Sequence, residues 1–182
     1  MIRKMEEKNK YDLMILGPVS KDILIDCHGE RTELLGGAVL QSGWAASGIG
    51  ANVVLYTKYN MKEVNITEEL EKFPKDVYCS HSEHTTSIIN QYFTEDKEKR
   101  ECSLVNKCDS FKIEEIPDVK VGTYHLAGLV VGDFEESFIK ELSKKGKVAV
   151  DVQCFLRKAD ETGAMNFEDW KLKKECLPYI HY

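Results

Sequence analysis

The sequence predicts an α/β layered domain in which a mostly parallel central sheet carries one projecting β element. Residues 121–151 read as strand, helix and strand, and such a unit implies parallel strands joined by a right-handed crossover. Residues 11–17 and 52–57 are short apolar runs bounded by turn residues, which is typical of buried strands in a parallel sheet. Residues 22–35 and 85–108 have the pattern of hairpins, and they predict the projecting element.

The first part of the chain is organised around the apolar segment 38–46. Strand 11–17 ends at Gly-Pro, and the hairpin over 22–35 then leads the chain directly to Gly36 and Gly37. Apolar residues dominate 38–46, so the segment reads as a helix that is buried on most of its circumference. Glycines follow it, as expected for a left-handed C-terminal cap, and the next strand comes directly after them.

Later elements follow from capping, periodicity and turn signals. A capping-box-like start at Asn65-Ile-Thr-Glu68 predicts a helix that Pro74 closes. A charged turn at 94–99 joins two extended runs into a hairpin. The same signals predict strands at 77–80, 85–93, 100–108, 121–127 and 147–151, and helices over about 134–142 and 167–177.

The glycine pair Gly36-Gly37 lies just before a helix N-terminus, a position with chemical meaning. Glycine permits unusual backbone angles and close backbone approach, while free N–H groups and the helix dipole favour an oxygen-rich ligand. A tight helix entry without a ligand is the alternative. Gly48-Ile-Gly50 is not a dinucleotide fingerprint, because it precedes a strand and lacks a third glycine at the required spacing.

Composition excludes several classes of protein. The chain has 182 residues, 42% of them hydrophobic, which is enough for a single domain over 1–182 with its own core. A net charge of −6, with basic residues interspersed among acids, argues against a nucleic-acid partner. No apolar run approaches the ~20 residues of a membrane helix, and the charged start lacks an apolar signal core. We therefore expect a cytoplasmic protein with no membrane partner, whose six cysteines are reduced and buried.

The arrangement of these motifs resembles the N-terminal part of the ribokinase-like (PfkB) carbohydrate kinases. The shared features are an apolar first strand, Gly17 with Asp22 five residues on, a small β lid, the glycine pair before a helix, the run GIGAN before a strand, and the progression HLAGL…GD…VAVDVQ. The likeness covers nearly the whole chain and lies in the order and spacing of the motifs. It implies a ribokinase-like layered α/β fold with a β lid from about 22–35, to which 85–108 could also contribute.

The resemblance implies phosphoryl transfer from ATP, with Mg²⁺, to a hydroxyl of a small-molecule sugar or nucleoside-like substrate. By position, Asp22 would bind substrate hydroxyls, the backbone of Gly36 and Gly37 would approach the substrate closely, and the lid would exclude water. Many members have an asparagine four residues after the second glycine, where this chain has Gln41. Glutamine can still bind a hydroxyl, from a longer arm, so the identity of the sugar does not transfer.

The family also implies parts that residues 1–182 lack. These are a glycine-rich anion hole with the catalytic Asp and the nucleotide-binding segments; Gly163-Ala164 is followed by Met-Asn and has no acid at the required position. Transfer needs that Asp as general base and those N–H groups to stabilise the phosphoryl group. We therefore expect no catalytic residue in this chain, a fold incomplete at its C-terminus through truncation or a split reading frame, and no turnover by 1–182 alone.

Asp151, Gln153 and Arg157 follow the C-terminal end of a parallel strand, where α/β proteins bind ligands. They could line the phosphate side of the site, and helix capping with surface pairing is the alternative. Asp22 has an alternative too, as a turn residue that accepts from nearby N–H groups.

Thr86 and Asn90 share one face of a hairpin strand with Tyr92, and they could contact substrate or a second subunit. Lids in the ribokinase-like family often pair between subunits, so the resemblance implies a homodimer through the lid. The charged turn at 94–99 could equally blunt the edge of the sheet.

Two functions of other classes stay open. One is a non-catalytic sugar- or nucleoside-binding or dimerisation module. The other is a metal-binding protein that uses Cys79, His81 and His84, whose thiolate and imidazole groups suit Zn²⁺. No fourth ligand is evident for this cluster, so we expect no metal site there.

Overall fold

The structure is a computed structural model that describes residues 11–71 and 76–182. The charged start at 1–10 and the end of the expected second helix, at Phe73 and Pro74, lie outside these residues. None of the helices in the described ranges is long and apolar enough to cross a membrane. All six cysteines are free thiols, of which three are buried and three half-buried.

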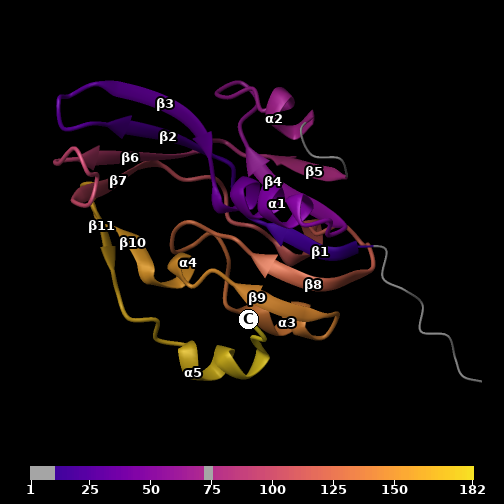
Figure 1. Ribbon diagram of the computed structural model, residues 1–182. Helices are drawn as coiled ribbons and strands as arrows, with labels where there is room; N and C mark the ends of the chain where they lie inside the picture. Colours follow the sequence, from indigo (N-terminus) through magenta and orange to yellow (C-terminus); the bar gives the residue numbers. More distant parts are fainter. Residues whose placement is uncertain (1–10, 72–75) are drawn as a thin grey trace, which may run out of the picture.

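The central sheet consists of five parallel strands in the order β5-β4-β1-β8-β9 (Figure 1). Their bounds are β1 Tyr11–Leu16, β4 Val53–Tyr59, β5 Val77–His81, β8 Val121–Leu126 and β9 Lys147–Val150. Helix α3 (Ser137–Ser143) connects β8 to β9, and this confirms the predicted strand–helix–strand unit. The chain ends beside β9, where the backbone N–H of His181 donates to the carbonyl of Val148 at 2.7 Å.

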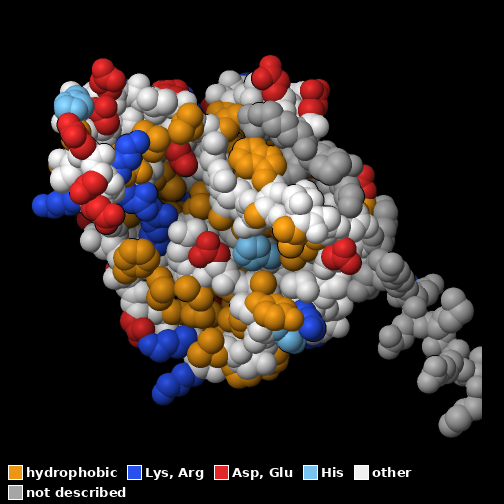
Figure 2. Space-filling model, in the orientation of Figure 1, with side chains coloured by type: hydrophobic (Ala, Val, Ile, Leu, Met, Phe, Trp, Pro, Cys, Tyr) orange, Lys and Arg blue, Asp and Glu red, His pale blue; other side chains and the backbone are white. Residues whose placement is uncertain are grey.

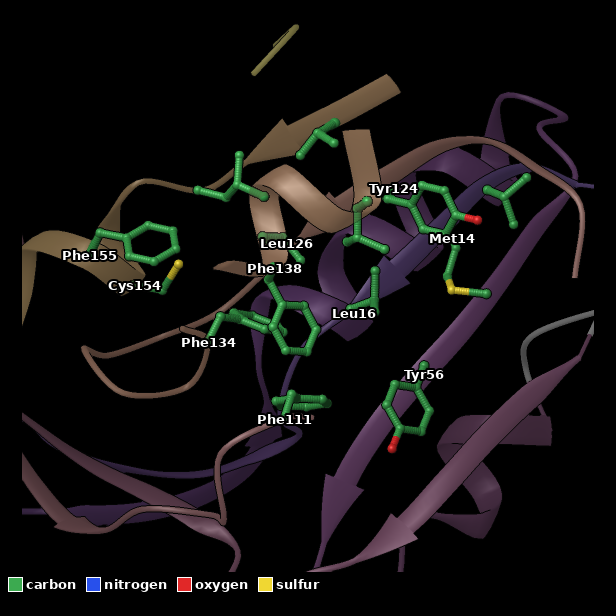
Figure 3. Close-up of a cluster of buried hydrophobic side chains, with 14 of the residues drawn as sticks. Met14, Leu16, Tyr56, Phe111, Tyr124, Leu126, Phe134, Phe138, Cys154 and Phe155 are labelled. Atoms are coloured by element: carbon green, nitrogen blue, oxygen red, sulfur yellow. The ribbon is translucent and has the colours of Figure 1, made fainter. Parts of the chain in front are cut away.

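Both faces of the central sheet are buried, because successive residues of a strand point to opposite faces. On one face Met14 packs into a large cluster that includes the stacked rings of Phe111 and Phe134, 4.8 Å apart (Figure 3). On the other face Ile15 packs in a cluster with residues of α1 (Ala38–Gly48). The apolar runs predicted as buried strands therefore serve two cores at once.

The projecting element is a four-stranded sheet, the lid sheet, with strand order β3-β2-β6-β7 (Figure 1). Its strands are β2 Ser20–Ile25, β3 Arg31–Gly36, β6 Thr86–Tyr92 and β7 Arg100–Asn106. Two antiparallel hairpins, β2–β3 and β6–β7, join through a parallel pairing of β2 with β6. The ranges 22–35 and 85–108 thus contribute to one sheet.

The remaining elements are short. They are α2 Thr67–Glu71 and the 3-10 turn Ile113–Glu115, followed later by α4 Gln153–Leu156, β10 Arg157–Ala159, β11 Met165–Phe167, α5 Lys173–Cys176 and the 3-10 turn Leu177–Tyr179. Strands β10 and β11 form an antiparallel pair of their own.

The expectation that the helix after the glycine pair is buried on most of its circumference is wrong. In α1 only Val39, Leu40 and Gly43 are buried, whereas Gln41 and Ala45 are exposed. The helix covers one face of β1 and β4 with a single side. Alanine is compatible with exposure because its methyl group presents little apolar surface, so an alanine-rich helix has no sequence signal for which side is buried.

The expected helix over 167–177 is wrong in its extent. Phe167 belongs to β11 and is 75% exposed, and α5 begins only at Lys173. Trp170 is buried and stacks on Phe155 at a ring distance of 4.6 Å, while the N–H of Glu168 donates to a carbonyl of α4. These contacts hold the segment against α4 in a non-helical conformation.

Candidate functional site

A cavity of about 370 Å³ opens between the lid sheet, the start of α1 and the segments that follow β8 and β9. This volume lies near the lower end of the roughly 300–1,000 Å³ that small-molecule pockets occupy. The polar side chains on its wall are those of Ser20, Asp22, Gln41, Asn90, Tyr92, Arg100, Gln153 and Arg157. Figure 2 shows Lys and Arg side chains gathered on this face beside the lid sheet.

Asp22 lies on β2, on the face of the lid sheet that lines the cavity. Side chains alternate along a strand, so Ser20, Asp22 and Leu24 all point to this face. The Ser20 hydroxyl donates to Asp22 Oδ1 at 2.9 Å. Burial raises the pKa of the Asp22 carboxyl, although the Ser20 hydrogen bond and the charges of Arg157 and Arg100 act in the opposite direction. Within the described part of the chain Oδ2 accepts no hydrogen bond, so a ligand hydroxyl could donate to it.

The glycine pair lets the chain pass from β3 into α1 beside this carboxylate. A Cβ at Gly36 would lie 2.3 Å from Asp22 Oδ2, and one at Gly37 would lie 2.5 Å from the carbonyl oxygen of Pro18. Gly37 also has φ 107°, a conformation that L side chains rarely adopt. Gly37 is the N-cap of α1 and has no side chain to cap the helix. Gly37 and Ala38 both line the cavity, so the N-terminus of α1 forms part of its wall.

Gln153 and Arg157 form another part of the wall, and Asp151 orients the Gln153 side chain. Gln153 Nε2 donates to Asp151 Oδ2 at 2.8 Å and to the carbonyl of Gly128 at 3.1 Å. The amide oxygen of Gln153 therefore faces Arg157, whose Nη1 donates to it at 3.3 Å. Asp151 itself is not on the cavity wall, since both of its carboxylate oxygens serve Gln153.

Asn90 and Arg100 come from the paired strands β6 and β7. The Cys102 thiol donates to Asn90 Oδ1 at 3.2 Å, which leaves the amide nitrogen of Asn90 for a ligand. Arg100 Nη1 donates to the Tyr92 hydroxyl at 3.4 Å, and this bond raises the pKa of the guanidinium.

A second cavity, of about 610 Å³, adjoins the first. It lies between β7 and β11, and it shares Arg100, Gln153 and Arg157 with the first cavity. The two strands are tied together by the N–H of Leu104, which donates to the carbonyl of Gly163 at 2.8 Å. The three shared side chains therefore mark the junction of the two cavities.

Eight residues that the sequence singled out line the first cavity: Asp22, Gly36, Gly37, Gln41, Asn90, Tyr92, Gln153 and Arg157. Thr86 does not, because it is buried and its hydroxyl accepts from the N–H of Cys108 at 3.1 Å. Sequence reasoning missed Ser20 and Arg100. The alternation of β2 could have indicated Ser20 from Asp22, whereas Arg100 reaches the cavity only because it pairs with Tyr92 across the hairpin.

The cysteine and histidine segment around Cys79 lies elsewhere and has other partners. His84 Nδ1 lies 3.1 Å from Glu63 Oε1, and this hydrogen bond raises the pKa of the imidazole. Across residues 11–71 and 76–182, no group of three or more His, Cys, Asp or Glu side chains could hold a metal ion.

The loop after β8, which supplies Leu129 to the cavity wall, is held by a fully buried carboxyl group. Asp133 Oδ2 accepts from the N–H groups of Leu129 at 2.7 Å and Val130 at 3.1 Å. Its Oδ1 is buried and has no hydrogen-bond partner in the described ranges. Burial therefore raises the pKa of Asp133, against the effect of the two N–H groups and of Lys107.

We expect the free energy of unfolding of the wild type to fall as pH rises, because Asp133 becomes charged, and we expect Asp133→Asn to lack this fall. Because the folded pKa of Asp133 is raised, its stabilising contribution is complete below the unfolded pKa, near 4, and is lost as pH rises through the folded pKa. Asparagine stays neutral and can still accept from Leu129 and Val130. Urea unfolding of both proteins between pH 4 and 8 measures this. The free energy of unfolding of the variant should increase relative to that of the wild type as pH rises, whereas parallel pH profiles would contradict the raised pKa.

No protein-family model matches the sequence, and no curated protein sequence matches it either. Solved structures do match. A sulfate complex of a pyrophosphate-dependent kinase in the ribokinase family has a TM-score of 0.83 and 28% identity, over 92% of this chain and 59% of that chain. A pyrophosphate-dependent ribokinase-family kinase complexed with a pyrophosphate analogue and myo-inositol has a TM-score of 0.83 and 27% identity, over 92% of this chain and 58% of that chain.

The chain has the fold of kinases in the ribokinase family. The nucleoside kinase of Methanocaldococcus jannaschii, a further ribokinase-family structure, shares the fold with a TM-score of 0.59 at 14% identity, over 80% of this chain and 54% of that chain. The chain spans less than three fifths of the length of these three structures. The predicted layered α/β fold with a mostly parallel sheet is thus confirmed.

Proposed function

We propose that residues 11–182 form the acceptor-binding part of a kinase that transfers a phosphoryl group to a hydroxyl of a small polyol, either a sugar or a cyclitol. The observation that carries this proposal is the half-buried Asp22 carboxylate, which lines a cavity of about 370 Å³ together with amide and guanidinium groups. Support also comes from the related kinase structure that holds myo-inositol, at 27% identity.

The polar groups of the cavity match what polyol recognition requires. A hydroxyl needs an acceptor for its proton and a donor for its oxygen. Asp22 Oδ2 supplies the acceptor, and the Asn90 amide nitrogen and the two arginines supply donors. Leu34 and Ile88 on the lid sheet add apolar surface, and a ligand under this sheet would be shielded from water.

The phosphoryl donor is a separate proposal. The family resemblance favours ATP with Mg²⁺, and the related structures that act with pyrophosphate favour pyrophosphate. The described residues offer no cluster of three acidic, histidine or cysteine side chains for a metal. We therefore assign neither the donor nor its metal to them. The general base for the acceptor hydroxyl is likewise not assigned to this chain.

The first test is binding of myo-inositol, as a probe polyol, to wild type and to Asp22→Asn, measured by calorimetry. Removing the charged acceptor is expected to weaken binding by about tenfold or more, since hydrogen bonds to charged groups contribute roughly 1.5–3 kcal/mol. Asp118→Asn is the matched control, because Asp118 is exposed and outside both cavities. Equal affinity of wild type and Asp22→Asn would contradict the proposed role of Asp22.

The alternative function is a module that binds a sugar or nucleoside, or dimerises, without transfer. One observation favours it, namely that residues of this chain line a cavity of about 370 Å³ with polar side chains. Incubation of 1–182 with myo-inositol and either labelled ATP or labelled pyrophosphate distinguishes the two. Turnover by these residues alone would contradict our proposal that the catalytic residues lie outside them.

We also propose a cytoplasmic location and a homodimer formed through the lid sheet. The six free thiols support the first proposal, since reduced cysteines are typical of that compartment. The edge strand β3, whose residues 31–34 are exposed, supports the second. Sedimentation velocity would measure the oligomeric state directly.

A further inference from the structure

We propose that Asp133 is a positioning residue of the polyol site, where it sets the orientation of the Gln153 side chain. It acts through the peptide bond between Gly128 and Leu129. This inference rests on the proposed function, because it assigns a role in polyol binding to a residue that lies outside both cavities. It gives the buried Asp133 carboxyl group a role besides stabilising its own loop.

The peptide bond between Gly128 and Leu129 is held at both of its polar ends. Its N–H group donates to Asp133 Oδ2 at 2.7 Å, and its carbonyl accepts from Gln153 Nε2 at 3.1 Å. Because a trans peptide bond is planar, its N–H and C=O groups point in opposite directions and turn as one unit. The hydrogen bond to Asp133 therefore fixes the direction in which the carbonyl oxygen faces Gln153.

Asp133 is completely buried, so solvent does not compete for its hydrogen bonds. Its Oδ2 also accepts from the N–H of Val130 at 3.1 Å, so two consecutive N–H groups point at one oxygen. Without that oxygen both N–H groups would be unpaired in the protein interior, which costs roughly 1–3 kcal/mol for each group. We therefore expect the loop to rotate its peptide bonds toward other acceptors when the carboxyl group is removed.

Gly128 brings this loop into direct contact with α4. A Cβ at Gly128 would lie 2.6 Å from the Cβ of Cys154, so a larger residue would push the loop away from the helix. The close approach places the Gly128 carbonyl within reach of the neighbouring Gln153 side chain. The loop also binds β10, since the N–H of Val131 donates to the carbonyl of Arg157 at 2.9 Å.

Gln153 transmits the orientation of the peptide bond to the cavity wall. Its amide nitrogen donates to the Gly128 carbonyl and to Asp151 Oδ2, so its amide oxygen is turned toward Arg157 Nη1, 3.3 Å away. Gln153 and Arg157 both line the first cavity. Rotation of the peptide bond would remove one of the two bonds that hold this amide. Asp133 therefore controls how polar groups face a polyol that it does not contact.

The first experiment measures the environment of the Gln153 amide without any ligand. Its side-chain signals in a proton–nitrogen correlation spectrum of the whole chain are assigned by their loss in Gln153→Ala. In Asp133→Ala they should shift toward the position of a solvent-exposed glutamine, and in Asp133→Asn they should stay, because the asparagine oxygen can accept from the same N–H groups. Asp26→Ala is the matched control: Asp26 also accepts from two loop N–H groups, those of His28 and Glu30, but lies outside both cavities.

The second experiment measures binding of myo-inositol to wild type, Asp133→Ala, Gln153→Ala and the double variant by calorimetry. Each single variant is expected to weaken binding about threefold to tenfold, which corresponds to the loss of one hydrogen bond. Because Asp133 acts through Gln153, the double variant should stay within about twofold of the weaker single variant, whereas independent effects would multiply. Asp133→Asn should bind myo-inositol as the wild type does.

The proposal is overturned if the Gln153 amide signals do not move in folded Asp133→Ala, if Asp26→Ala moves them equally, or if the losses multiply in the double variant. Circular dichroism verifies folding, and Asp133→Ser, whose shorter side chain cannot reach both N–H groups, replaces Asp133→Ala if that variant is unfolded. A wild type that binds no myo-inositol would contradict the proposed function alone, because the amide signals still decide whether Asp133 orients Gln153.

Discussion

Replacing Gly37 by alanine is expected to lower the free energy of unfolding by about 3 kcal/mol, because two independent costs add. The backbone at Gly37 has φ 107° and ψ 137°, a region that only glycine visits readily. An added Cβ would also lie 2.5 Å from the Pro18 carbonyl oxygen and 3.2 Å from the Ser20 nitrogen, which are backbone atoms with little freedom to move.

Urea denaturation of Gly37→Ala measures this loss, and Gly48→Ala is the matched control. Gly48 is the last residue of the same helix, has ordinary φ, and its Cβ would meet nothing within 4 Å. Alanine there should leave stability unchanged or raise it by about 0.5–1 kcal/mol, since glycine is the poorer helix former. Equal effects at the two positions would contradict the strain assigned to the junction of β3 and α1.

Replacing Glu115 by alanine is expected to destabilise the protein by about 2 kcal/mol, because it leaves a buried ammonium group without its counter-charge. The Lys58 side chain is 3% exposed, and its Nζ lies 2.7 Å from Glu115 Oε2. The same nitrogen donates to the carbonyl of Ser110 at 3.0 Å and lies 5.4 Å from the centre of the Phe111 ring. The expected loss is below that of a fully buried pair, since Glu115 itself is 33% exposed.

Two further variants test the cause of that loss. Lys58→Met combined with Glu115→Ala removes the buried charge together with its partner, so the double variant should recover much of the stability. Glu141→Ala breaks an exposed ion pair with Lys144 and should change stability little. A double variant no more stable than Glu115→Ala would show that the buried charge is not the cause.

Local sequence signals were sufficient for most strands. The run from Tyr11 to Leu16 is apolar almost throughout, because its side chains enter two cores on opposite faces of the sheet. The hairpin over 85–108 follows from two extended runs and a charged turn, which are neighbours in the chain. Strands that follow one another in the chain pair through a short turn, so the sequence pattern alone can predict their pairing.

The same signals failed where packing decides the conformation. In α1 the alanines gave no information about which side is buried, and the fully buried residues of the helix are Val39, Leu40 and Gly43. Near the C-terminus, Trp170 stacks on Phe155 and holds a segment with helix-forming residues in an irregular path. Tertiary contacts outweigh helix propensity, which amounts to less than about 1 kcal/mol per residue for ordinary residues.

The sequence by itself determined most of the strands, the glycine-started helix and the residue types of the candidate site, because periodicity, turn chemistry and backbone freedom are local properties. Only the tertiary structure decided that β2 pairs in parallel with β6, and that Arg100 and Arg157 reach one junction beside Asp22. These residues are far apart in the chain. They line one cavity because the two hairpins pair into the lid sheet and because this sheet and α4 both border that cavity. The physical reason is that long-range strand pairing and side-chain packing select among arrangements that local patterns leave equally acceptable.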